Sequence, residues 1–165
     1  KKGCTQIGAD HIVSWRPSPT MISNGFDEEQ IRKTIRQGLR DSAGCHVEIT
    51  NLIIPGENDS DEAFTALFDW ATSVSPAMPV HLSRYHPDYR MKNPATPEAT
   101  LRRAHDLAMQ RMQFVYVGNA DIRGTADTVC PGCGATVIER VGFAARSRTK
   151  DGTCPACGVA LGVVT

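Results

Sequence analysis

The chain has 165 residues, enough for one ordinary domain or for a compact domain with a small appendage. Hydrophobic residues make up 41% of it, so a buried core can form. Basic and acidic residues number 18 each, so no global field attracts nucleic acid or an anionic membrane. We find no run of about 18 apolar residues and no signal-peptide pattern, and we expect a cytoplasmic protein without a membrane partner. The chain begins at Lys1 without an initiator methionine, so we expect it to be part of a longer protein.

The first part of the chain predicts one strand and one helix. Residues 10–15 form a short run rich in β-branched side chains, and a proline-rich loop ends it. Asp27 is followed three residues later by Gln30, a capping-box pattern that marks a helix start. Apolar residues then recur at helical spacing, so we expect an amphipathic helix over residues 28–41.

A second strand and helix follow. Residues 46–54 are rich in β-branched side chains and end at Pro55, which predicts a strand. Ser60 and the two polar residues before it offer helix caps, and acidic residues suit the positive end of the helix dipole. An apolar face then continues at helical spacing, which predicts a second helix; the face consists of Phe64, Leu67, Phe68 and Ala71.

The pattern repeats once more before the chain changes character. Residues 79–83 are the third predicted strand. Thr96 is a cap candidate because Pro97 follows it at the first helical position, and the predicted helix runs to about residue 110. Residues 114–118 form the fourth predicted strand.

Strands that alternate with helices of about 10 to 15 residues indicate βαβ units and a parallel sheet. Four such units correspond to half of a β/α barrel. We therefore assign residues 1–120 to a partial barrel and residues 121–165 to a small appended module. The open edges of a half-barrel favour a missing N-terminal half or a second chain as its partner.

Two copies of one short unit dominate the appended module. Residues 130–134 read CPGCG and residues 154–158 read CPACG. Each unit presents two sulfurs to one ion, and a hairpin formed by residues 135–141 and 143–148 would bring the units together. Free or disulfide-bonded cysteines would leave the repeated proline and glycine unexplained. The sequence therefore predicts a four-cysteine zinc ribbon with the ligands Cys130, Cys133, Cys154 and Cys157.

Zinc is the ion that this pattern favours. Iron bound as in rubredoxin uses the same four ligands, so a rubredoxin-like electron carrier is an alternative function. Electron-transfer sites usually lie in an aromatic shell, and only Phe143 is close to these cysteines in the sequence. Four thiolates leave no open coordination position, so we expect the ion to be structural.

The predicted hairpin is basic. It carries four basic residues, Arg140, Arg146, Arg148 and Lys150. Zinc ribbons often bind nucleic acid through such faces, so a nucleic-acid or protein-binding module is a second alternative. Glu139 and Asp151 dilute the positive charge, which favours a solvated face over a nucleic-acid surface.

From His46 onward, several strings occur in an order known from one enzyme family. They are residues 46–59 (HVEITNLIIPGEND), 79–89 (PVHLSRYHPDY), 96–98 (TPE) and 116–119 (YVGN), followed by the two cysteine units. Together they resemble the C-terminal half of the AmmeMemoRadiSam-system radical SAM enzyme, which is related to the pyruvate formate-lyase activating enzymes. The resemblance implies a partial β/α barrel that uses S-adenosylmethionine and a 4Fe-4S cluster to form a 5′-deoxyadenosyl radical.

One part of the family pattern is absent. The three-cysteine cluster motif, C-x-x-x-C-x-x-C, has no counterpart in this sequence, and the spacing of Cys4 and Cys45 does not replace it. We therefore expect radical chemistry only in the full-length enzyme and an inactive chain in isolation. The substrate, a protein or a small molecule, is not specified by these residues.

Ligands of such barrels lie at the C-terminal ends of the strands. Alternation places Glu48 and Thr50 on one face of their strand, and we expect them to contact the methionyl or ribose groups of the cofactor. The turn at Pro55 and Gly56 resembles the loop that borders the adenine in radical SAM enzymes. For each of these residues, an ordinary hydrogen-bonded role is the alternative. Candidates for a substrate pocket follow on the later strands and loops: His81, Ser83, Arg84, His86 and Asn119.

Overall fold

The structure is a computed structural model, and it describes residues 12–13, 28–41 and 46–162. The chain forms two compact units, Lys1–Glu48 and Ile49–Thr165. Within the described residues, no helix has both the length and the apolar character needed to cross a membrane.

The described part of the first unit contains a short parallel strand pair and the helix α3. Strand β1 (Ile12–Val13) pairs in parallel with β2 (His46–Val47), and helix α3 (Glu28–Asp41) lies between them in the sequence. The predicted helix over residues 28–41 is confirmed, whereas its predicted cap at Asp27 lies outside the described residues.

The strand predicted over residues 46–54 is interrupted. Strand β2 ends before Glu48, and β3 (Ile49–Ile53) begins after it. The two pieces have different neighbours, because β2 pairs with β1 whereas β3 pairs with β4. The continuous β-branched run in the sequence gives no sign of this change of partner.

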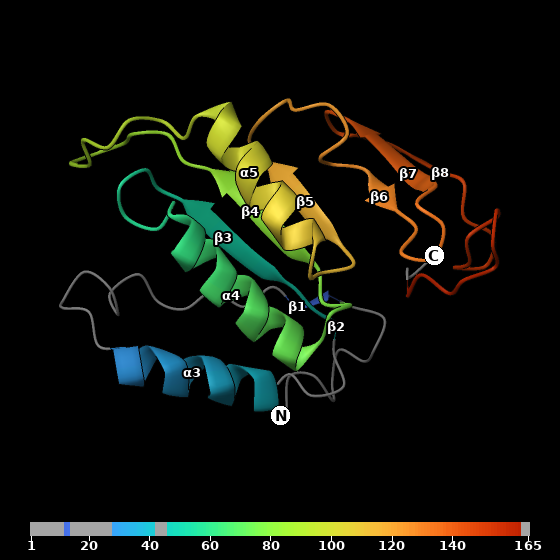
Figure 1. The fold of residues 1–165 in the computed structure, drawn as a ribbon, viewed down its shortest axis with the longest axis horizontal. Coiled ribbons are helices and arrows are strands. Elements are labelled where there is room, and N and C mark those ends of the chain that lie inside the picture. Colours follow the sequence, from blue (N-terminus) through green and yellow to red (C-terminus); the bar gives the residue numbers. More distant parts are fainter. Residues whose placement is uncertain (1–11, 14–27, 42–45, 163–165) are drawn as a thin grey trace. The chain divides into compact units, whose positions relative to one another are not determined.

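A three-stranded parallel sheet forms the centre of the second unit. Its order is β3, β4 (Val80–Arg84) and β5 (Val115–Gly118), and all pairs are parallel. Helices α4 (Asp61–Val74) and α5 (Glu98–Met109) connect these strands and lie on the same face of the sheet (Figure 1). The predicted βαβ order is therefore present from β3 to β5.

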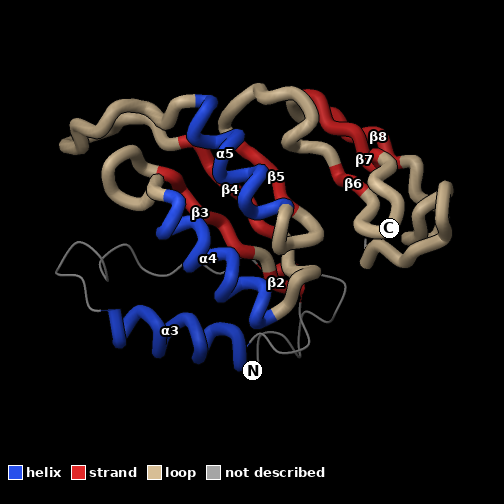
Figure 2. Tube along the Cα trace, in the orientation of Figure 1, coloured by secondary structure: helices blue, strands red, loops and turns tan. Residues whose placement is uncertain are grey.

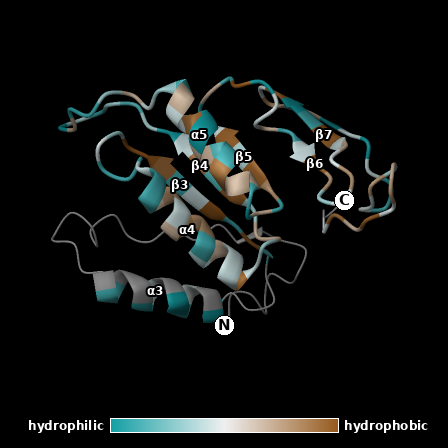
Figure 3. Ribbon diagram, viewed as in Figure 1, coloured by the Kyte–Doolittle hydropathy of each residue, from teal (hydrophilic) through white to brown (hydrophobic). Residues whose placement is uncertain are grey.

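Strand alternation separates two faces of this sheet. The face toward the helices buries Ile53, Val80, Leu82, Val115 and Val117. They pack with buried side chains of the two helices, and hydrophobic residues are prominent along β3 and β5 (Figure 3). The opposite face, called the polar face below, carries side chains that are exposed or half-buried: Thr50, Leu52, His81, Ser83 and Tyr116.

Thr96 fastens two strands together instead of capping a helix. Its Oγ1 donates to the carbonyl of Ile53 at 2.6 Å and accepts the N–H of Tyr85 at 2.9 Å. The N-cap of α5 is Pro97, without a side-chain hydrogen bond. The predicted cap at Thr96 was wrong because its hydroxyl is occupied by these two tertiary bonds. At α4, in contrast, Ser60 is the cap, and its side chain accepts the N–H of Ala63.

The C-terminal part is a small antiparallel sheet among loops (Figure 2). Its order is β6 (Thr128–Val129), β7 (Thr136–Val141) and β8 (Ala144–Ser147). The predicted hairpin is present as β7 and β8, and Gly142 begins the turn between them with a φ of 58°. Strand β6 was not predicted, because two residues are too few for a periodic pattern.

The fold class is therefore mixed α/β, with small parallel and antiparallel sheets. No closed or half-closed barrel is visible among the residues that the structure describes. The division at residue 120 into a barrel and an appended module stays a prediction.

Replacing Thr96 with valine removes both hydrogen bonds of its hydroxyl while preserving the shape of the side chain. We expect Thr96→Val to lower the free energy of unfolding by about 2 kcal/mol, because a buried carbonyl and a buried N–H lose their partner. Thr65→Val on α4 is the control, since the Thr65 hydroxyl makes no hydrogen bond with other described residues, and we expect a change within about 0.5 kcal/mol. Urea denaturation measures the free energy of unfolding of both variants. Equal losses would contradict the role of the two Thr96 hydrogen bonds.

Candidate metal centre

Two turns of the same backbone geometry carry the four cysteines. In the first, the N–H of Cys130 donates to Ala135 O at 2.8 Å, and the N–H of Gly134 donates to Cys130 O at 2.9 Å. The glycine that ends the turn has a φ of 74°, which a side chain would strain. This geometry accounts for the glycine at the end of the CPGCG unit.

The second turn has the same two backbone hydrogen bonds as the first. The N–H of Cys154 donates to Val159 O at 2.9 Å, and the N–H of Gly158 donates to Cys154 O at 2.8 Å. Gly158 has a φ of 77°. We call these two turns the knuckles. They differ at one point, because a Cβ on Gly132 would lie 2.9 Å from Val159 Cγ2, so the knuckles pack together without room for a side chain there.

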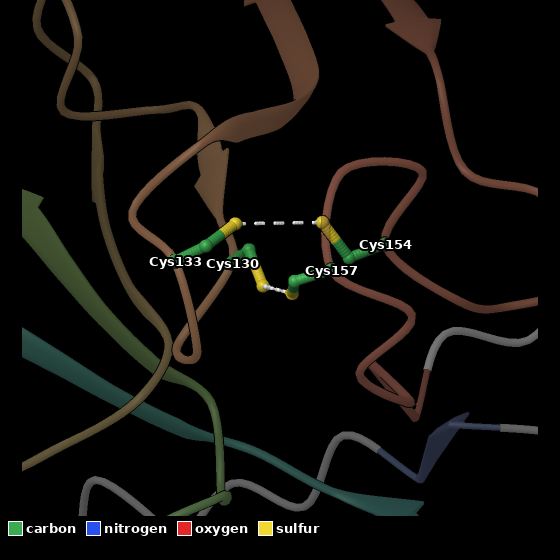
Figure 4. Close-up of side chains that lie close together, drawn as sticks. All are labelled: Cys130, Cys133, Cys154 and Cys157. Carbon is green, nitrogen blue, oxygen red and sulfur yellow. Dashed lines mark hydrogen bonds between the residues drawn. The ribbon is translucent and has the colours of Figure 1, made fainter.

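The knuckles bring four sulfurs to one point (Figure 4). All four Sγ atoms lie within 4.8 Å of one another. Cys130 Sγ is 3.6 Å from Cys157 Sγ, and Cys133 Sγ is 3.7 Å from Cys154 Sγ. Sulfurs bound at about 2.3 Å to a tetrahedral ion are about 3.8 Å apart, whereas disulfide sulfurs are about 2.0 Å apart. The four cysteines are therefore placed to hold a metal ion, as predicted, and both zinc and iron fit this ligand set.

The thiols do not all ionise by themselves. Burial raises the pKa of the Cys130 thiol, but the N–H groups of Cys133 and Gly132 and two neighbouring sulfurs outweigh this effect and lower the pKa to about 7. The N–H of Val159 favours the thiolate of Cys157, but partial burial and the three other sulfurs raise its pKa to about 12. A bound cation supplies the charge that lets all four become thiolates.

The rest of the module adds little apolar support. Its buried cluster consists of Cys130, Cys154 and three aliphatic side chains, Val137, Ile138 and Leu161. Two of the predicted ligands are thus part of the core itself, while Cys133 and Cys157 are exposed. A core this small is typical of modules that a metal ion stabilises.

The polar face of the parallel sheet brings several predicted site residues together. The rings of His81 and Tyr116 stack with centroids 5.1 Å apart. Asn119 Nδ2 donates to Ser83 Oγ at 2.9 Å, and the backbone of Asn119 has a φ of 57°. Thr50 is exposed on the same face and is opposite His81 in the strand register.

Other predicted site residues lie elsewhere. Arg84 lies on the opposite face of β4 from His81 and Ser83, and its Nε donates to Thr96 O at 3.0 Å. His86 is exposed in the loop after β4, and Glu48 is half-buried just before β3. Pro55 and Gly56 form a turn in which Gly56 has a φ of 80°. The carbonyl of Pro55 accepts a bond from Asn93 at 2.9 Å.

Sequence analysis missed three residues that join the polar face to the metal module. Tyr116 Oη lies 3.1 Å from the hydroxyl of Thr128, which also accepts Arg140 Nη1 at 2.9 Å. The Arg140 guanidinium carbon lies 5.1 Å from the centroid of the Tyr116 ring. Strand alternation places Tyr116 beside His81 and was available as a signal. The position of Arg140 depends on how the module folds, and no local pattern indicates it.

Comparison with known proteins gives one relative. A region of 111 residues, which is 66% of the chain, is 39% identical in sequence to an uncharacterized protein of Methanocaldococcus jannaschii. The chain spans about one third of the length of that relative. No family model matches the chain, and no solved structure matches it.

Elemental analysis should find one metal ion per chain after purification without added metal, because the two knuckles supply one complete ligand set. Cys133→Ser should lose most of that metal and expose the chain after about residue 119 to limited proteolysis, while the parallel sheet stays protected. Cys45→Ser, outside the knuckles, is the control and should retain the metal. Disulfides among the four cysteines, or full metal occupancy in Cys133→Ser, would contradict the site.

Metal binding should release protons. At pH 7 the Cys157 thiol, with a pKa of about 12, is protonated in the metal-free chain and must lose its proton on binding. This group alone makes the apparent affinity rise about tenfold for each pH unit between pH 6 and 8. Calorimetry in two buffers of different ionisation enthalpy counts the protons, and a count near zero would argue against thiolate ligation.

Proposed function

We propose that this chain is the C-terminal part of a radical SAM enzyme similar to that of the AmmeMemoRadiSam system, with a structural zinc ribbon at its end. The polar face of the β3-β4-β5 sheet is the observation that carries the proposal. Parallel sheets are usually covered on both faces. This one has helices on one face, whereas the other carries hydrogen-bonding side chains together with the exposed Leu52. Such a face suits the inner wall of a β/α barrel, where ligands bind near the C-terminal strand ends.

The strand ends add support. Asn58 receives the N–H of Ile54 at 2.7 Å and donates to Leu52 O at 2.9 Å, so the loop after β3 is fixed against its own strand. The buried hydroxyl of Tyr85, just after β4, makes no hydrogen bond with other described residues. A bound water molecule would satisfy this hydroxyl.

Within this proposal, S-adenosylmethionine lies along β3. Thr50 presents its hydroxyl on the polar face, and Glu48 precedes it by two residues. These side chains would bind the methionyl or ribose groups, and the turn at Pro55 and Gly56 would border the adenine. His81, Ser83 and Asn119 would face the substrate, which is a protein or a small molecule.

The residues present do not fit a 4Fe-4S cluster. Such clusters need three neighbouring thiolates with one iron left open, and the only four-thiolate group among the described residues is the closed set of the knuckles. The cluster must therefore come from a missing N-terminal half of the barrel or from a second chain. The matched region covers only 33% of the relative, and a protein of that length has room for such a half.

We assign zinc to the knuckles. No aromatic residue belongs to the buried cluster around the sulfurs, and an iron site for electron transfer usually has an aromatic shell. The elemental analysis described above distinguishes the two ions, and a rubredoxin-like carrier would contain iron.

A second candidate function rests on the tip of the β7–β8 hairpin. Phe143 is fully exposed there, and Val141 beside it is also exposed. An exposed aromatic residue near Arg146 is typical of a surface that contacts nucleic acid or protein. The positive charge is partly used, however, because Arg148 pairs with Glu139. Binding of a single-stranded oligonucleotide that Phe143→Ala abolishes would favour this candidate.

The radical SAM proposal predicts that the chain alone forms no 5′-deoxyadenosine after anaerobic reconstitution with iron and sulfide. Addition of the N-terminal half that carries the cluster motif should restore both the cluster absorption and the cleavage of S-adenosylmethionine. In that assembly Glu48→Ala and Thr50→Val should weaken S-adenosylmethionine binding about tenfold, because each removes a polar contact. Thr65→Val on α4 is the matched control. Cleavage by the chain alone, or no cleavage by the assembly, would refute the proposal.

A further inference from the structure

The junction between the zinc module and the parallel sheet is built around one arginine. Arg140 belongs to β7, and its Nη1 donates to Ala126 O at 2.8 Å and to Thr128 Oγ1 at 2.9 Å. Its guanidinium lies over the Tyr116 ring, which stacks in turn on His81. Thr50, His81 and Tyr116 occupy equivalent positions on β3, β4 and β5, so Arg140 extends a polar row that crosses the sheet.

The charge of Arg140 has no acidic partner among the described residues. The ion pairs there join other residues, and no carboxylate oxygen lies within 4.0 Å of this guanidinium. Asp127 lies close by, but its Oδ1 accepts the backbone N–H of Arg140 at 2.7 Å. The contact with Tyr116 offsets part of the cost of a half-buried cation and leaves its charge in place.

Several donors of the guanidinium also lack partners among the described residues. Arginine has five N–H donors in a planar fork, and only Nη1 of Arg140 has hydrogen-bond partners among the described residues. The Nε and Nη2 groups are therefore available together. This edge of the fork matches the two oxygens of a carboxylate or a phosphate.

From this geometry we infer that Arg140 and the rings of Tyr116 and His81 form a binding site for the carboxylate or phosphate group of a small molecule on the polar face. The aromatic rings hold the guanidinium in one orientation and exclude water from one of its sides. The zinc module has a second role in this arrangement, because β7 delivers the cation to a sheet that has no such residue at this row. The inference goes beyond the proposed function and does not depend on radical chemistry.

The site can be tested directly on the zinc-bound chain labelled with nitrogen-15. Nuclear magnetic resonance follows the arginine Nε–Hε signals while inorganic phosphate, and separately malonate, is added at constant ionic strength. We expect the Arg140 signal to shift and saturate with a midpoint on the order of millimolar, as suits a small ion bound by one fork. The relative midpoints of the two anions tell which group the site prefers.

Exposed arginines of the same hairpin are internal controls. Arg146 is exposed on β8, and Arg148 already pairs with Glu139. Their signals should shift much less than that of Arg140 and should not saturate. Equal, linear shifts at all three arginines would overturn the inference, and so would a stronger response to a single-stranded oligonucleotide centred on Arg146.

Substitution gives a second test. Arg140→Lys keeps the charge and loses the fork, so phosphate should bind at least tenfold more weakly, whereas Arg146→Gln should leave the midpoint unchanged. Zinc content and circular dichroism establish that each variant is folded. If Arg140→Lys loses zinc, the titration of the native chain alone decides the question. Loss of S-adenosylmethionine cleavage would bear on the proposed function and not on this site.

Discussion

Charge repulsion among four sulfurs is the constraint on which the C-terminal module depends. Four thiolates within 4.8 Å of one another would repel strongly. In the metal-free chain, despite the N–H of Val159, burial and hydrogen bonds to the other sulfurs keep the pKa of Cys157 high. A divalent cation bound between the sulfurs would compensate this charge. Since Cys130 and Cys154 also belong to the buried cluster, the ion and the small core stabilise each other.

The consequences of this centre extend to the parallel sheet. Cys130 directly follows β6, and β6 holds Thr128, whose hydroxyl bonds to both Tyr116 and Arg140. A bound metal would therefore fix two turns and, through β6 and β7, the side chains that lie beside the polar face. A module whose four cysteines are placed to enclose an ion would thus contribute to the surface on which ligands would bind.

The parts that the sequence predicted well are those whose cause is local. Each CPxCG unit contains its own turn, its ligands and the glycine that the backbone needs, so the metal site could be predicted from the units alone. The helices were also predictable, because the apolar faces that indicate them repeat within a few residues. Thr96 was misassigned since its partners, Ile53 and Tyr85, are distant in the sequence. Arg140 was placed on a solvated face for the same reason: its contact with Tyr116 exists only after two sheets have met.

The last strand of the module is an edge strand in the part of the chain that the structure describes. Strand β8 ends the order β6-β7-β8, and all four of its residues are exposed. Its outer row of backbone groups is a template onto which a strand from another molecule can pair, which is the usual origin of edge-to-edge aggregation. The short length of β8 and the charge of Arg146 at its centre limit such pairing. Lengthening this hairpin or neutralising that arginine would remove the protection and favour self-association of the chain.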